Sequence, residues 1–257
     1  TETLDGKEMD LEFTAVRFSY EADREILKGV SMEFPAGSFT SIVGTSGCGK
    51  STAAAILMGR NQGYQGSVTI EGKELSLIRE DSLMEHITLV SHNSYLFKGT
   101  VEDNLRMGKP DASEEEMENA LKSVNLWGFL SAQQGLATPL AEKGANLSGG
   151  QCQRLAIARA LLHDTPVYIF DEATSNIDAE SEEMIMDVIH ALAKTKTVIL
   201  ISHRLANVVG SDRIYMMTDG RIPETGRHEK LIEQDGEYAK LYRSQMELEQ
   251  YGKEAAV

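Results

Sequence analysis

The sequence lacks any apolar run of about 18 residues, the shortest length with which a helix crosses a bilayer. Its start also lacks the pattern of a signal peptide. We therefore expect none of the 257 residues to span a membrane. Basic residues are too few to offset the acidic ones, which leaves a net charge of −15 and no basic stripe. This charge argues against a nucleic-acid partner and is typical of a solvated acidic surface.

Cysteine is also scarce. Cys48 and Cys152 are the two in the chain, and they lie far apart inside glycine-rich stretches. Two separated cysteines indicate neither a disulfide framework nor a zinc site. We expect free thiols in a reducing compartment.

A glycine-rich stretch between an apolar strand pattern and a helix pattern is the strongest signal in the chain. The strand is expected at 39–43 and the helix at 53–58. This order is the context of a phosphate-binding loop, whose backbone N–H groups and helix N-terminus surround phosphate oxygens. The loop residues are Gly44, Thr45, Ser46, Gly47, Cys48, Gly49, Lys50, Ser51 and Thr52. Lys50 is placed to reach the β- and γ-phosphates, and the Ser51 hydroxyl to ligate Mg²⁺.

Two carboxylates follow a second apolar strand pattern at 166–170. A carboxylate at the tip of a buried strand beside a phosphate loop can hold Mg²⁺, usually through a water, and Asp171 suits this position. Glu172 is then placed to orient and polarise an attacking water. Without the phosphate loop, the same pair would more often be a solvated helix cap.

A third signal is Ser148-Gly149-Gly150-Gln151. Ser148 and Gln151 have the spacing of a capping box, which predicts that a helix begins here and continues through Arg159. Such a helix start offers unpaired N–H groups and a hydroxyl, so it predicts a second phosphate-binding element. The chain therefore has two phosphate-binding helix starts and one lysine-bearing loop.

The order GTSGCGKST, LSGGQ, VYIFDEATSNID and ISH resembles the ATP-binding cassette (ABC) ATPase family, over about 11–241. The resemblance implies an α/β P-loop NTPase core with an antiparallel β subdomain and a helical insert subdomain at about 93–160. It implies binding of ATP and Mg²⁺. It also implies a second ABC ATPase domain, identical or different, whose phosphate loop faces Ser148, Gly149 and Gly150 across a shared γ-phosphate.

Other functional residues are implied by the same resemblance. Tyr20 matches the aromatic residue that stacks on adenine. Glu172 matches the catalytic glutamate, and His203 matches the histidine that contacts the γ-phosphate. Asp178 matches the recurrent carboxylate of the loop that crosses the dimer interface.

His92 departs from the family pattern, because glutamine is expected there. That glutamine usually supplies an oxygen to Mg²⁺ and couples the site to the membrane partner. An imidazole is a poorer ligand for Mg²⁺, and its titration near neutral pH would add a pH dependence. The alternative is a tolerated substitution in which a water bridges to the metal.

Segments 96–105, 139–144 (with Glu142 as the contact residue) and 226–231 resemble the exporter type of this family. The resemblance implies a transmembrane domain upstream, with 1–10 as the linker from it, 11–250 as the ATPase domain and 251–257 as a C-terminal tail. The domain would lie at the cytoplasmic face of the membrane. An importer subunit and a regulatory cassette with weak hydrolysis remain alternatives. About a hundred residues between the two phosphate motifs are too few for the coiled-coil arms of a chromosome-maintenance ATPase.

Local patterns predict the remaining elements. Alternation of apolar and polar residues predicts strands at 11–20 and 26–34, and short apolar runs predict strands at 67–70, 87–90, 197–201 and 214–217. Capping-box spacings at Thr100 and Ser113 predict helix starts. We expect 96–136 to be mostly helical, with Trp127 and Phe129 as core anchors, and helices at 179–193 and 228–249.

Overall fold

The computed structural model describes residues 2–254. At its centre lies a six-stranded sheet in the order β12-β11-β3-β10-β9-β6. Strand β12 is antiparallel to β11, and the other neighbours are parallel. The strands are β3 (Phe39–Val43), β6 (Ile87–Ser91), β9 (Val167–Asp171), β10 (Thr197–Ser202), β11 (Arg213–Thr218) and β12 (Arg221–Gly226).

The central sheet is covered on both faces. Val167 and Ile169 of β9 lie in one apolar core, whereas Tyr168 and Phe170 lie in the other. Successive side chains of a strand point to opposite faces, so a strand buried on both sides is apolar at every position. This explains the continuous apolar runs that the sequence shows at β9 and β10.

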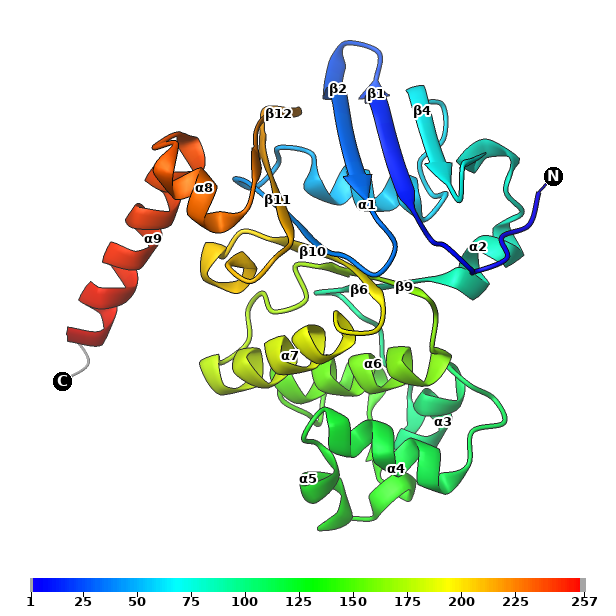
Figure 1. Ribbon diagram of the computed structural model, residues 1–257. Coiled ribbons are helices and arrows are strands. Elements are labelled where there is room, and N and C mark those ends of the chain that lie inside the picture. The colour runs from blue at the N-terminus through cyan, green and yellow to red at the C-terminus, as the bar shows by residue number, and fades with distance from the viewer. Residues whose placement is uncertain (1, 255–257) are drawn as a thin grey trace.

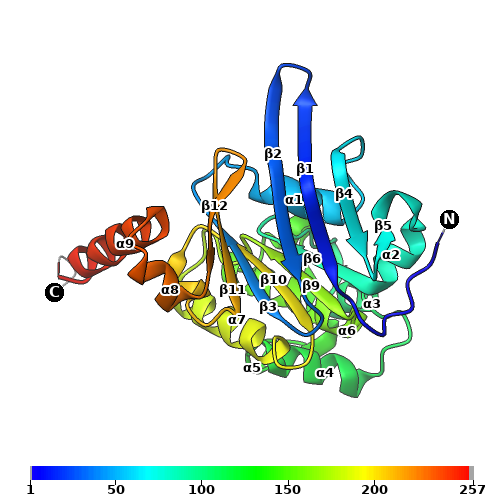
Figure 2. The same ribbon diagram turned by 45° about the horizontal axis from the view of Figure 1, so that its top comes forward.

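A four-stranded antiparallel sheet covers one of these faces, in the order β2-β1-β4-β5 (Figure 2). Along β1, Leu11 and Phe13 are buried and Glu12 is exposed, the alternation expected of a sheet with one solvated face. The predicted antiparallel subdomain is confirmed. Its strands are β1 (Leu11–Glu21), β2 (Arg24–Phe34), β4 (Gln65–Ile70) and β5 (Lys73–Glu74).

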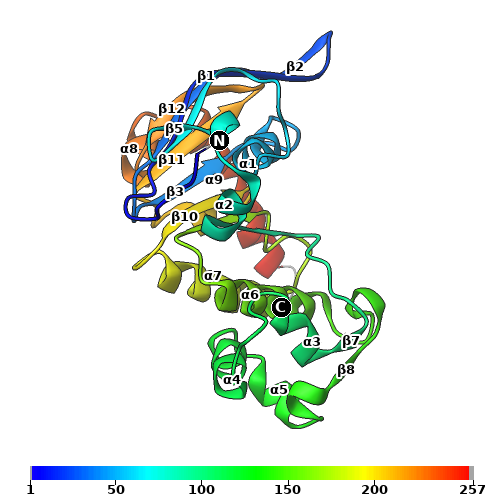
Figure 3. The same cartoon turned by 90° about the vertical axis from the view of Figure 1, so that its right-hand side faces the viewer.

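Helices α6 and α7 lie against the opposite face, and α3, α4 and α5 form a further layer beyond them (Figures 1 and 3). The predicted capping boxes at Thr100 and Ser113 are both present. The short strands β7 (Gly99–Thr100) and β8 (Pro139–Leu140) pair within this helical part. Within 2–254, none of the helices has the length and apolar character needed to cross a membrane. The helices are α1 (Lys50–Leu57), α2 (Glu80–His86), α3 (Val101–Arg106), α4 (Glu114–Ser123), α5 (Trp127–Ser131), α6 (Gly149–His163), α7 (Ala179–Leu192), α8 (His228–Glu233) and α9 (Glu237–Glu254).

The prediction that Phe129 is a core anchor is wrong. Trp127 packs against the core, but Phe129 is 38% exposed. The two residues are two positions apart in α5, so they point to nearly opposite sides of the helix. Leu130, which is fully buried, fills the core instead.

The ends of the chain are more structured than the sequence indicates. The predicted helix at 228–249 is two helices, because the chain turns between α8 and α9 at Asp235, where φ is +53°. Helix α9 continues to Glu254 into the predicted tail, and 255–257 lie outside the described residues. In the predicted linker 1–10, Leu4 and Met9 are buried in the core that contains β1.

The two positions in α5 give a stability test. Leu130→Ala should lower the free energy of unfolding by about 2–5 kcal/mol, because it leaves a cavity in the core. Phe129→Ala should lower it by less than about 1 kcal/mol, because Phe129 is 38% exposed and does not fill the core. Urea unfolding followed by circular dichroism measures both changes. Equal losses would contradict the burial of Leu130 described here.

Candidate functional site

The predicted nucleotide residues follow four neighbouring parallel strands of the central sheet. Gly44 follows β3, His92 follows β6, Glu172 follows β9 and His203 follows β10. The pairing register brings these strand ends level, since Asp171 lies opposite both Ser91 and Ile201 and Val43 lies opposite Ser202. Ligands of parallel α/β sheets bind outside the carboxyl ends of the strands.

A cavity of about 550 Å³ lies at this edge. Most of its lining was predicted from the sequence. Ser175 and Asn176 were not assigned to the nucleotide site, and neither were Arg24 and Ile26. The last two belong to β2, and only the folding of the antiparallel sheet over α1 brings them here. The cavity is lined by Tyr20, Arg24, Ile26, Ser46, Gly47, Gly49, Lys50, Ser51, Thr52, His92, Glu172, Ser175, Asn176 and His203.

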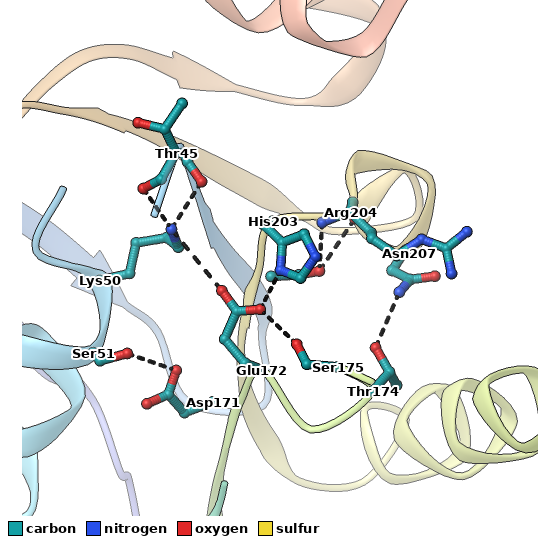
Figure 4. A network of polar contacts seen from close by, with 12 residues as sticks. Thr45, Lys50, Ser51, Asp171, Glu172, Thr174, Ser175, His203, Arg204 and Asn207 are labelled. Carbon is teal, nitrogen blue, oxygen red and sulfur yellow. Dashed lines mark hydrogen bonds and ion pairs between the residues drawn. The ribbon is translucent and has the colours of Figure 1, made fainter. Parts of the chain in front are cut away.

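Backbone carbonyl groups of the phosphate loop bind the ammonium group of Lys50. Lys50 Nζ donates a hydrogen bond of 3.0 Å to the carbonyl oxygen of Thr45 (Figure 4). It donates another, of 2.8 Å, to the carbonyl oxygen of Gly44, and the Cys48 thiol lies beside it. Gly47 has a φ of +78°, and a Cβ there would meet no described atom within 4 Å. The backbone geometry therefore requires glycine at this position, and the loop presents an open N–H surface to the cavity.

Ser51 and Asp171 form the candidate metal site. Ser51 Oγ donates a hydrogen bond of 3.1 Å to Asp171 Oδ1 (Figure 4). Burial raises the pKa of the Asp171 carboxyl, an effect that the hydrogen bond from Ser51 opposes. A buried carboxylate is stabilised by a cation, and a hydroxyl and a carboxylate are oxygen ligands that Mg²⁺ accepts. The residues present therefore fit a magnesium ion.

The carboxylate of Glu172 is held by contacts with several side chains. Its Oε2 accepts a hydrogen bond from Ser175 Oγ (2.9 Å) and contacts His203 Nδ1, and its Oε1 lies 4.0 Å from Lys50 Nζ (Figure 4). Its backbone has a φ of +55°, a strained conformation for a residue other than glycine. A hydrogen bond from its N–H to Ile201 O (2.9 Å) stabilises this turn.

Tyr20 lies at the outer rim of the cavity. Its ring is 61% exposed, and its hydroxyl accepts a hydrogen bond from Asn61 Nδ2 (2.8 Å). Phe18 contacts the ring edge to face, with 4.9 Å between the ring centroids. The ring is therefore held in place with surface available for stacking on a planar base.

The second predicted phosphate element lies elsewhere in the chain. Ser148 and Gln151 form the predicted capping box at the start of α6, and Ser148 and Gly149 are exposed there. Neither they nor Gly150 and Asp178 are among the described residues that line the cavity. One chain thus contains two separate predicted phosphate elements.

Asp178 lies beside this second element. Its carboxylate caps α7 by accepting the Ser181 N–H (2.8 Å), and this hydrogen bond lowers the pKa of Asp178. A Cβ on Gly150 would lie 2.1 Å from Ser181 Oγ and 3.0 Å from Asp178 Oδ2. Glycine therefore allows the starts of α6 and α7 to meet, which couples the Ser148 motif to the Asp178 loop.

Comparison with known proteins identifies the family. A family model described as ABC transporter matches residues 27–175, which is more than half of the chain. The chain belongs to the ABC transporter family. An ABC transporter ATP-binding protein of Haemophilus influenzae, itself uncharacterized, is 44% identical over 94% of this chain and 43% of its own length. An ATP-dependent lipid A-core flippase of Saccharophagus degradans is 40% identical over 91% of this chain and 40% of its own length.

The structural comparison agrees with this assignment. A bacterial Atm1-family ABC exporter with ATP bound matches with a TM-score of 0.90 and 38% identity, covering 95% of this chain and 43% of that one. The chain thus spans less than half the length of these relatives. It is an ATP-binding domain in a family of ATP-hydrolysing domains, and it is similar over most of its length to part of that exporter. The family resemblance seen in the sequence is confirmed.

Two adjacent glycines test the contact between α6 and α7. Gly150→Ala should lower the free energy of unfolding by about 1–3 kcal/mol, because the new methyl group collides with Ser181. Gly149→Ala is the matched control, because a Cβ there would lie 3.9 Å from the nearest described atom. This substitution should lower the free energy of unfolding by less than about 0.5 kcal/mol. Thermal and urea unfolding measure both. Ser181→Gly should relieve the Gly150→Ala defect, and failure to do so would argue against the collision.

Proposed function

We propose that two ABC domains, identical or different, hydrolyse ATP between them and thereby drive transport through a membrane partner. The phosphate loop of one domain and the Ser148 motif of the other enclose the γ-phosphate. The separation of these two elements within one chain is the observation that carries the proposal. Neither element alone surrounds a terminal phosphate, but a head-to-tail pair of domains completes two sites.

In this proposal the triphosphate binds in the cavity beside the phosphate loop. The side chain of Lys50 is 4% exposed and donates to two neutral carbonyls, so its charge is available to phosphate oxygens. The loop N–H groups add donors that require no rearrangement. Tyr20, at the rim, stacks on the adenine.

Ser51 and, through a water, Asp171 would hold Mg²⁺ beside the phosphates. The ion would neutralise charge on the transferring phosphoryl group. His92 lines the same cavity. It would act on a bound metal ion either directly or through a bridging water. A direct contact would make metal binding and coupling differ from those of a glutamine-bearing site, because imidazole nitrogen is a softer ligand than an amide oxygen.

Glu172 orients and polarises the attacking water. Its carboxylate is positioned by Ser175 and His203, and its side chain is 18% exposed, so few waters compete for it. A carboxylate in this setting accepts a proton while the water attacks in line. His203 would hold the γ-phosphate once ATP is present, which requires it to exchange its contact with Glu172 for the ligand.

An apolar groove on the surface supports the proposal of a membrane partner. It has a volume of about 630 Å³ and is lined by residues of α2, β6 and α6 and of the segments that follow β6 and α3. Four of the exposed large apolar side chains line it, namely Met84, Tyr95, Phe97 and Met107. Large apolar groups gathered in one groove indicate a docking site for another protein segment. Tyr95 also donates a hydrogen bond of 3.4 Å to Glu142, the predicted contact residue of the exporter-type segment.

We therefore propose that the domain lies at the cytoplasmic face of a membrane, with a transmembrane domain seated in the groove. Different affinities of the paired and separated states for ATP would move that domain. The alternative of an importer subunit would keep the same ATP chemistry with a separate membrane chain. Sequencing of the flanking gene region distinguishes the two.

Replacement of the proposed base tests hydrolysis. Glu172→Gln keeps the shape of the side chain and should lower kcat by about 10²–10⁴-fold while ATP binding changes by less than about threefold. Phosphate release and nucleotide titration measure the two quantities. Glu183→Gln, at an exposed position of α7, is the control and should leave kcat unchanged. An unchanged rate in Glu172→Gln would exclude Glu172 as the base.

Mixing two inactive variants tests the shared site. Lys50→Ala disables the phosphate loop and Gly149→Ala disables the Ser148 motif, so each protein alone should be inactive. In the mixture, a mixed pair has one site with both elements intact, and about a quarter of the wild-type rate should return if half of the pairs are mixed. The double variant mixed with Gly149→Ala should stay inactive. No recovery in the first mixture would mean that the two elements do not act across a pair.

A further inference from the structure

Helix α9 is attached to the domain in two different ways. Its first turn is anchored by Tyr238, which is fully buried in the core. Toward its end, Leu248 and Tyr251 are 69% and 70% exposed. This later part contacts the domain through the polar side chains of Gln245 and Glu249. These polar contacts converge on the segment that carries His203.

Gln245 forms a pair of hydrogen bonds with this segment. Its Nε2 donates to the backbone oxygen of His203 (2.7 Å), and its Oε1 accepts the backbone N–H of Leu205 (2.9 Å). Two backbone groups spaced in this way are those that a strand offers to its neighbour. The carboxamide therefore takes the place of a peptide unit directly after β10. A flipped amide would put oxygen against oxygen, so the orientation is determined by both partners.

Arg204, between these two positions, adds a second attachment. Its guanidinium pairs with Glu249 of α9 (2.8 Å) and with Glu182 of α7. Glu182 is buried and also accepts a hydrogen bond from Asn207 (2.8 Å). Charged groups in a partly buried network keep their relative positions, because a movement that separates one pair leaves a charged group without its partner. The backbone around His203 is thus held between α7 and α9.

The imidazole of His203 has little support of its own. Its side chain is 48% exposed, and it contacts Glu172. The direction of such a side chain depends on the backbone from which it projects, and small displacements of a reacting group can cost large factors in rate.

We propose that Gln245 is a positioning residue for ATP hydrolysis, acting through the His203 backbone. The inference rests on the proposed function, in which His203 holds the γ-phosphate. Helix α9 is then part of the hydrolytic apparatus, although Gln245 is absent from the described lining of the cavity.

The experiment compares Gln245→Ala and Gln245→Glu with wild type in the 257-residue chain. Alanine removes both hydrogen bonds, whereas glutamate keeps the size and places a carboxylate oxygen against the His203 carbonyl. Both should lower kcat about tenfold and change KM for ATP by less than about twofold. Gln250→Ala, at an exposed position of the same helix, is the control and should match wild type. An unchanged kcat in both Gln245 variants overturns the proposal.

A double-mutant cycle separates positioning from general loosening of the structure. Single-turnover hydrolysis of labelled ATP is measured for His203→Ala with and without Gln245→Ala. Because Gln245 acts through His203, the second change should have no further effect in this background. A further tenfold loss there would show that Gln245 acts by another route. If Glu172→Gln and His203→Ala themselves leave turnover unchanged, the proposed function fails. If they lower turnover and the Gln245 variants do not, only the inference about Gln245 fails.

Discussion

Parallel pairing of β3, β10, β9 and β6 is the constraint on which the site depends. Backbone hydrogen bonds set Asp171 level with Ser91 and Ile201, and Ser202 level with Val43. A shift of one residue in any pair would turn the alternating side chains to the opposite face. Since both faces of these strands are buried in apolar cores, such a shift would also disrupt the packing on each side. The register that stabilises the fold is therefore the one that brings together the residues proposed to bind phosphate, hold a metal ion and orient water.

The polar side chains of the site are paired with one another. Lys50 donates to the carbonyls of its own loop, Ser51 donates to Asp171, and Glu172 contacts Ser175 and His203. These contacts keep buried polar groups satisfied, because an unpaired one would cost about 1–3 kcal/mol. In the proposed function, a bound nucleotide would exchange these partners instead of ordering loose side chains. Under the proposed role of Gln245, the contacts of α9 with the backbone around His203 link a peripheral helix to the site of hydrolysis.

Local signals predicted much of the structure because their physics is local. Capping boxes at Thr100, Ser113 and Ser148 each satisfy N–H groups within one turn, so their signal depends on residues only three positions apart. The burial of a side chain, by contrast, depends on residues that are distant in sequence. Phe129 has the character of a core residue, but its side of α5 faces water. The break before α9 and the burial of Leu4 and Met9 depend equally on partners that are distant in sequence.

The sequence alone determined the chemistry of each element: a lysine-bearing phosphate loop, two carboxylates after a strand and a second phosphate-binding helix start. These predictions follow from residue type and short spacing. The tertiary structure decided which elements share a cavity. It brought Arg24 and Ile26 to the nucleotide site, placed Ser148 outside it and set Gln245 against the backbone of His203. Those relations depend on strand order and helix packing across the whole chain, and no short stretch of residues encodes them.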